Sequence, residues 1–227
     1  MEATEPPPEL QGDQSKADIV EAQLMLGQMA LDRGEHDAAF EWFRVAAMGG
    51  DARALNMLGR CFERGWGTAP DLARAHDYFF HAAERGDAWA MFNLADLCSQ
   101  SGAYRDDAKA YALYVEAARR GVGKALNMIG LFHEDGRVVP ADREQAATFF
   151  LAGAEGGDCW AQMNHARLLI ENGNIDSALP WLERSLESGF PDFWATLGTG
   201  FAEHAEPRLR DICRRALALA ASSERNA

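Results

Sequence analysis

The chain has 227 residues, 48% of them hydrophobic, and its 35 acidic residues outnumber the 22 Lys and Arg, giving a formal net charge of −13. This composition supplies enough apolar side chains for a core, and its negative charge argues against general nucleic-acid binding. No run reaches the roughly 18 apolar residues of a membrane span, and the opening MEATEPPPEL lacks the basic and apolar segments of a signal peptide. We therefore expect a cytoplasmic protein that does not insert into membranes.

Along the chain, a Gly-Asp phrase recurs at nearly constant intervals. The glycines that mark it stand 36, 35, 36 and 32 positions apart and are Gly50, Gly86, Gly121, Gly157 and Gly189. Such spacing is typical of stacked repeats. We predict a disordered segment at 1–16, where three prolines follow one another, a repeat region at 17–206, and a C-terminal capping helix and tail at 207–227. The repeat units are expected at about 20–50, 51–86, 87–121, 122–157, 158–189 and 190–206.

The Gly-Asp phrase predicts a junction between two helices. Glycine adopts the left-handed conformation that ends a helix, and an aspartate after it accepts hydrogen bonds from the first N–H groups of the next helix. The phrase reads GGDARA from Gly49 and GGDCWA from Gly156, whereas RRGVGKA carries Val122 in place of the aspartate. We expect the Val122 junction to lack a side-chain cap and to be the weakest.

Within each unit, the apolar residues follow two helical patterns around a loop. Leu55, Leu58, Gly59 and Phe62 stand at i, i+3, i+4 and i+7, which is one face of a helix. A small residue recurs on this face, which predicts close approach of the partner helix in six units, at Gly27, Gly59, Ala95, Gly130, Ala166 and Gly198. Because Gly67 lies in a loop, we expect Gly67→Leu to destabilise the fold less than Gly59→Leu.

These patterns resemble a known repeat family. The segment LGRCFERGWGTAPDLARAHDYFFHAAERG, and next IGLFHEDGRVVPADREQAATFF, are similar to the Sel-one-like repeat, a longer-looped relative of the tetratricopeptide repeat. The resemblance covers roughly residues 20–200 in five to six units. It implies an all-α solenoid, a right-handed superhelix of antiparallel helix pairs, whose first helices line a concave face.

The residue patterns for catalysis and metal binding are absent. No phosphate-binding loop, dinucleotide fingerprint or nucleophile elbow occurs, and the HEDGR sequence at His133 lacks the second zinc-ligand histidine, since Arg137 stands there. Cys61, Cys98, Cys159 and Cys213 fit no metal spacing, so we interpret them as buried packing residues, as we do His133. We expect no enzyme activity, no metal and no cofactor.

The helical wheel places another set of residues opposite the core face of the first helices. Large apolar and basic side chains gather there. With Asn93 and Asn164, which the resemblance adds, the candidate set comprises Arg53, Asn56, Arg60, Arg64, Trp89, Phe92, Asn93, Lys124, Asn127, Trp160, Met163, Asn164 and Arg167. Related tetratricopeptide repeats often carry, at the positions of Asn93 and Asn164, an asparagine that bonds a bound peptide. We predict a groove for a protein or peptide that carries carboxylates. Alternatively, the tryptophans pack on the preceding unit, and the arginines form surface ion pairs with Glu63 or Asp96.

Three functions follow from these observations. The first is a non-enzymatic scaffold or adaptor that binds a protein segment in the groove. The second is a structural subunit that uses its convex face or its termini within a larger assembly. The third is a cell-wall-associated enzyme, which the resemblance allows because some bacterial members have been discussed as such, although it would require export. The oligomeric state stays open.

Overall fold

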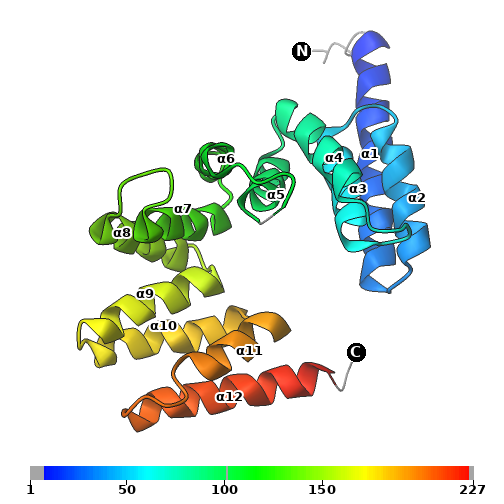
Figure 1. The fold of residues 1–227 in the computed structure, drawn as a ribbon. Helices are drawn as coiled ribbons and strands as arrows, with labels where there is room; N and C mark the ends of the chain where they lie inside the picture. Colours follow the sequence, from blue (N-terminus) through cyan, green and yellow to red (C-terminus); the bar gives the residue numbers. More distant parts are fainter. Residues whose placement is uncertain (1–7, 101, 225–227) are drawn as a thin grey trace, which may run out of the picture. The chain divides into compact units, whose positions relative to one another are not determined.

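The structure is a computed structural model that describes residues 8–100 and 102–224, and these residues form twelve helices and no strand (Figure 1). The helices are α1 (Pro8–Asp32), α2 (His36–Ala47), α3 (Ala52–Arg64), α4 (Leu72–Glu84), α5 (Ala88–Ser99), α6 (Asp107–Arg119), α7 (Lys124–Asp135), α8 (Arg143–Glu155), α9 (Cys159–Glu171), α10 (Ile175–Ser188), α11 (Pro191–Gly200) and α12 (Pro207–Glu224). They divide into two compact units, unit 1 up to Asp106 and unit 2 from Asp107. The prediction of an all-α helical-repeat solenoid is confirmed.

Within each of the two compact units, the second helix of one repeat packs against the first helix of the next repeat. In unit 1 this contact joins α2 to α3 and α4 to α5, and in unit 2 it joins α6 to α7 and α8 to α9. First helices also touch one another, α3 with α5 and α7 with α9. The buried residues accordingly form several separate clusters, for example one that contains Phe43 and Leu58 in unit 1 and one that contains Phe193 and Leu197 in unit 2.

The junctions behave as the Gly-Asp phrase predicts. The carboxylates of Asp51, Asp87 and Asp158 accept hydrogen bonds from backbone N–H groups three residues on, at 3.0, 2.6 and 2.8 Å. The preceding glycines have positive φ angles of 77°, 89° and 87°. At the remaining junction, which follows Gly121, α7 begins after Gly123 without a side-chain cap, and Val122 is buried. The expected loss of that cap is confirmed.

Small residues on the first helices allow the close approach that we expected. A side chain at Gly59 would place its Cβ 2.5 Å from the Phe79 ring, and one at Gly130 would place it 2.6 Å from the Phe150 ring. Ala95 and Ala166 are fully buried at the same position of their helices. The aromatic rings of the second helices thus lie directly on the small residues of the first.

Gly67 does not behave as an open loop position. Its Cβ would lie 2.5 Å from the carbonyl oxygen of His36 and 2.7 Å from the Phe40 Cβ, and its φ is +65°. Backbone contacts cannot yield as a flexible side chain can, so a leucine here would clash with α2 as well as strain the turn. The premise that Gly67 lies in an open loop was wrong, because the loop packs on α2. The comparison of Gly67→Leu with Gly59→Leu stays a prediction.

The N-terminal helix is longer than the proline-rich sequence suggested. Residues 8–16, which we expected to be disordered, belong to α1, and residues 1–7 of that predicted tail lie outside the described part of the chain. Pro8 is the first residue of the helix, where its missing N–H costs nothing, and the following Glu9, Leu10 and Gln11 are good helix formers. At the other end α12 packs against α11 and α10, and its capping role stays a prediction.

Candidate functional site

The predicted groove residues lie on four first helices, in two groups. The first group, on α3 and α5 of unit 1, contains Arg53, Asn56, Arg60, Arg64, Trp89, Phe92 and Asn93. The second group, on α7 and α9 of unit 2, contains Lys124, Asn127, Trp160, Met163, Asn164 and Arg167. Within each group the two helices are in contact, so each brings its own residues together. A continuous groove through both groups stays a prediction.

Asparagine pairs connect the two helices of each group. The Asn93 side-chain amide donates to the Asn56 side-chain oxygen at 2.8 Å, and Asn164 donates to Asn127 at the same distance. Asn56 and Asn127 are buried, although the helical wheel placed them on an open face, and Asn164 is buried as well. They are buried because a first helix packs beside the next one, which the wheel of a single helix does not include. The side-chain amides of Asn93 and Asn164, which the resemblance suggested would bond a bound peptide, thus already form hydrogen bonds within the chain.

The arginines are largely engaged by acidic residues of their own unit. A guanidinium nitrogen of Arg53 lies 2.6 Å from a carboxylate oxygen of Glu21, and one of Arg167 lies 2.6 Å from a carboxylate oxygen of Glu134. Arg64 lies 3.3 Å from Glu63, so the alternative of a surface ion pair is confirmed there. These partners neutralise much of the positive charge that the sequence suggested for the groove.

Arg60 has a different environment from the other arginines. Its guanidinium carbon lies 5.0 Å from the centre of the Trp66 ring, and burial lowers the pKa of Arg60 from its ordinary value. Such a cation over an aromatic face is held by the charge distribution of the ring. Its position links α3 to the loop that follows, and this contact gave no signal in the repeat pattern.

The two tryptophans share a register but differ in their surroundings. Trp160 packs edge-on to Phe193 with a ring separation of 5.0 Å and borders the core cluster of unit 2. Trp160 is therefore a packed residue, but its ring contacts the following α11, whereas the alternative drawn from the sequence placed it on the preceding second helix. Trp89 lies 6.0 Å from Phe92 and keeps 49% of its surface exposed. Trp89 is therefore the large apolar side chain of the two groups that is best placed to meet a partner.

The cysteines and His133 are packing residues, as predicted. All four cysteines are buried free thiols, and burial raises the pKa of Cys61 to about 12 and that of Cys159 to about 11. His133 stacks on Phe149 with ring centres 5.2 Å apart, and its Nε2 lies 3.2 Å from the Tyr111 hydroxyl. Thiols with raised pKa values are poor nucleophiles near neutral pH.

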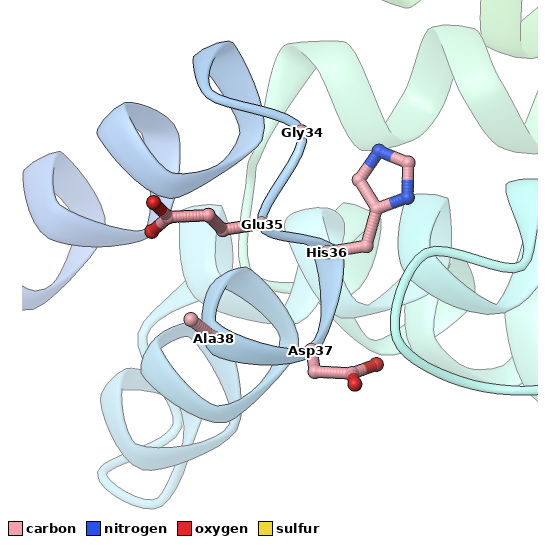
Figure 2. Close-up of a pocket in the computed structure, with 5 residues that line it drawn as sticks. All are labelled: Gly34, Glu35, His36, Asp37 and Ala38. Carbon is pink, nitrogen blue, oxygen red and sulfur yellow. The ribbon is translucent and has the colours of Figure 1, made fainter.

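A surface hollow at the turn between α1 and α2 brings two carboxylates near a histidine. It is lined by Gly34, Glu35, His36, Asp37 and Ala38. Figure 2 shows that the side chains of Glu35, His36 and Asp37 point in three different directions. Across residues 8–100 and 102–224, no group of three or more His, Cys, Asp or Glu could hold a metal ion. The hollow thus lacks a converging set of reactive groups.

The repeat geometry and a family comparison agree. The Sel1 repeat model matches residues 20–51, 52–87, 90–122 and 123–158, and this is the Sel-one-like pattern recognised above. The chain belongs to the Sel1 repeat family. As to membranes, none of the helices in the described part of this Sel1 repeat protein combines the length and the apolar character that crossing a bilayer requires.

Solved structures and curated proteins include similar Sel1 repeat proteins. A Sel1 repeat protein from Oxalobacter formigenes has a TM-score of 0.71 at 24% identity, covering 92% of this chain and 88% of its own. One from Klebsiella pneumoniae has a TM-score of 0.54 at 26% identity, with coverages of 82% and 96%. The rat DAP3-binding cell death enhancer 1 is 29% identical over 173 residues, which are 72% of this chain and 33% of that protein.

A plant protein is similar over a shorter stretch. HRD3A of Arabidopsis thaliana, a component of an ERAD-associated E3 ubiquitin-protein ligase, is 36% identical over 64 residues. That stretch is 28% of this chain and 9% of HRD3A. The chain thus spans a third or less of the length of these two curated relatives.

Proposed function

We propose that this Sel1 repeat protein is a non-enzymatic scaffold or adaptor that binds a protein segment on the faces of its first helices. The single observation that carries the proposal is Trp89, which is 49% exposed beside Phe92 although its counterpart Trp160 is packed. Exposed aromatic side chains are enriched at the centres of protein interfaces. The names of HRD3A and the rat DAP3-binding protein, a ligase component and a binding protein, support a role in assemblies.

The arginine pairs are compatible with a carboxylate-bearing partner. Side chains of Arg53 and its partner Glu21 are both about half exposed, at 53% and 54%. An exposed ion pair contributes only about 0 to 1 kcal/mol, so a partner carboxylate can replace the intramolecular one at small cost. Binding of this kind would weaken as salt increases, since exposed charges are screened beyond about 10 Å at 0.1 M.

The experiment compares two exposed tryptophans. Proteins enriched from source cells by the wild-type chain, Trp89→Ala and Trp42→Ala are quantified by mass spectrometry, and the affinity of the purified partner is then measured by calorimetry. Trp42 is a matched control because it is 38% exposed but lies on the second helix α2. Loss of an interface tryptophan typically costs about 2 kcal/mol or more, so we expect Trp89→Ala to weaken binding about thirtyfold and Trp42→Ala to leave it unchanged.

Two results would contradict the proposal. If Trp89→Ala and wild type bind every enriched protein equally, the first-helix face is not the binding site. If Trp42→Ala alone loses the partner, binding uses the second helices, and the structural-subunit alternative with its convex face is favoured instead. Circular dichroism of each variant checks that the helices are intact.

A further inference from the structure

The first and last helices each have a surface of the kind that, in the inner helices, forms the repeated contact between a second helix and the next first helix. A second helix packs on the next first helix at α2–α3, α4–α5, α6–α7 and α8–α9. α1 is a first helix with no second helix before it, and α12 is a second helix with no first helix after it, within residues 8–100 and 102–224. Each of these two helices therefore has a face that this contact leaves uncovered.

On α1 this face, here called the head face, is apolar and exposed. Leu26 and Met29 occupy positions one before and two after the small residue Gly27, and they are 39% and 45% exposed. The equivalents on α3, Leu58 and Cys61, are buried in a cluster with Phe43 of the preceding second helix. The same two positions are buried in later first helices, at Leu94, Leu97, Ile129, Phe132 and Leu168.

On α12 the matching face, here called the tail face, is centred on Leu217. Leu217 lies against Gly198 of α11, as Phe79 lies against Gly59 and Phe150 against Gly130. The two phenylalanines are fully buried, whereas Leu217 is 47% exposed. The difference follows from position, because Phe150 also packs with Leu168 of the next first helix, whereas the described residues contain no helix after α12.

The charges of the two helices are opposite. Over its whole length, the α1 segment contains five acidic residues and one lysine, a net charge of −4. The α12 segment contains four arginines against two acidic residues, a net charge of +2, and three of these arginines form ion pairs within the chain, Arg208 with Asp176, Arg214 with Asp211 and Arg215 with Glu183. Complementary charge favours association of unlike surfaces and disfavours pairing of like ones. A head face would thus meet a tail face rather than a second head face.

We propose that the tail face of one copy packs on the head face of a second copy, which continues the repeat series across molecules. The contact copies the packing of α2 on α3 and of α8 on α9, and buries Leu217 beside Leu26 and Met29. Because the two surfaces differ, the contact is heterologous and adds copies until a ring closes. The inference does not depend on the proposed function, since Trp89 belongs to neither face.

The test uses one variant with a blocked head face and one with a blocked tail face. Leu26→Glu with Met29→Glu blocks the head face, and Leu217→Glu blocks the tail face. Ala221→Glu, one turn after Leu217 and exposed, is a second tail variant that leaves the contact with Gly198 in place. Mass in solution is measured by sedimentation velocity over a series of concentrations.

We expect the wild-type mass to rise with concentration and each variant alone to stay monomeric. An equal mixture of head-blocked and tail-blocked variants should form a complex of two copies and no larger species, because one intact head and one intact tail remain. Trp89→Ala should behave as wild type.

Three outcomes would overturn the proposal: a wild type that is monomeric at every concentration, a blocked variant that still associates alone, or a mixture that stays monomeric. The second outcome would indicate a symmetric contact between like faces. Partner binding by the blocked variants reports separately on the proposed function.

Discussion

His165 shows how a single residue departs from the repeat pattern. It takes the position at which other first helices carry Leu58, Leu94 and Ile129, and its ring lies edge-on to Trp181 at 5.3 Å. Its Nδ1 is buried without a hydrogen-bond partner in the described structure. Burial lowers the pKa of His165 from its ordinary 6.5, against the smaller opposite influence of Glu155. The folded state therefore favours the neutral ring.

This lowered pKa predicts a pH dependence of stability. The unfolded chain binds a proton at His165 below about pH 6.5 while the folded chain resists it, so stability is fully present above 6.5 and decreases as pH falls toward the folded pKa. We expect His165→Leu, which restores the residue type of other repeats, to flatten this dependence between pH 7 and pH 5 in urea melts. His81→Leu is the control, since that histidine is exposed. An unchanged pH slope in His165→Leu would contradict the assignment.

At the scale of elements, the asparagine pairs join neighbouring first helices where apolar contacts would be expected. Asn127 and Asn164 are both buried. Their side-chain hydrogen bond joins α7 to α9, and the two residues lie 37 positions apart in the sequence. A buried polar group without its partner costs more than the bond itself contributes, about 1 to 3 kcal/mol against about 1 kcal/mol. Each asparagine thus requires the other.

A double-mutant cycle tests this dependence. We expect Asn127→Ala and Asn164→Ala each to lower the unfolding free energy by about 1 to 3 kcal/mol. The double variant should lose less than the sum of the two, with a coupling of about 0.5 to 1.5 kcal/mol in urea titrations, because no buried amide is left unpaired. Additive losses would show that the bond carries no net stability.

The sequence predicted those features of the elements that depend on neighbouring residues. The helix junctions, the aspartate caps and the small residues on the first helices follow from spacing along the repeats, so they could be predicted from the sequence. The Asn56–Asn93 bond and the crowding of Gly67 by α2 depend on contacts between residues about 30 or more positions apart. The pairing of the asparagines had one sequence signal, their equal spacing of 37, which the helical wheel does not use.

At the scale of the whole molecule, a repeat protein is stabilised by contacts between neighbours. Inner helices such as α3 pack on helices both before and after them, whereas α1 packs on α2 and α12 on α11 and α10. In such an array stability is approximately the sum of unit and interface contributions. The terminal helices therefore receive less stabilisation than the inner ones.

Amide hydrogen exchange should show this gradient. At low concentration, where copies do not associate, we expect α1 and α12 to exchange faster than α3 and α9, since local opening at an end breaks fewer contacts between helices than opening in the interior. At high concentration, protection of α1 and α12 should increase if copies associate. Uniform protection along the chain at low concentration would mean that it unfolds as one cooperative block.

The asparagine pairs also limit how such a chain can change its length. Asn56, Trp89 and Asn93 recur 71 positions later as Asn127, Trp160 and Asn164. The paired asparagines therefore repeat every two repeats, whereas the helix pair repeats in every one. Removal of a single repeat, 87–121, would leave Asn56 without the matching amide. Removal of 51–121 would delete one complete asparagine pair and keep the other. A change in length by two repeats therefore keeps the remaining asparagines paired, whereas a change by one repeat does not.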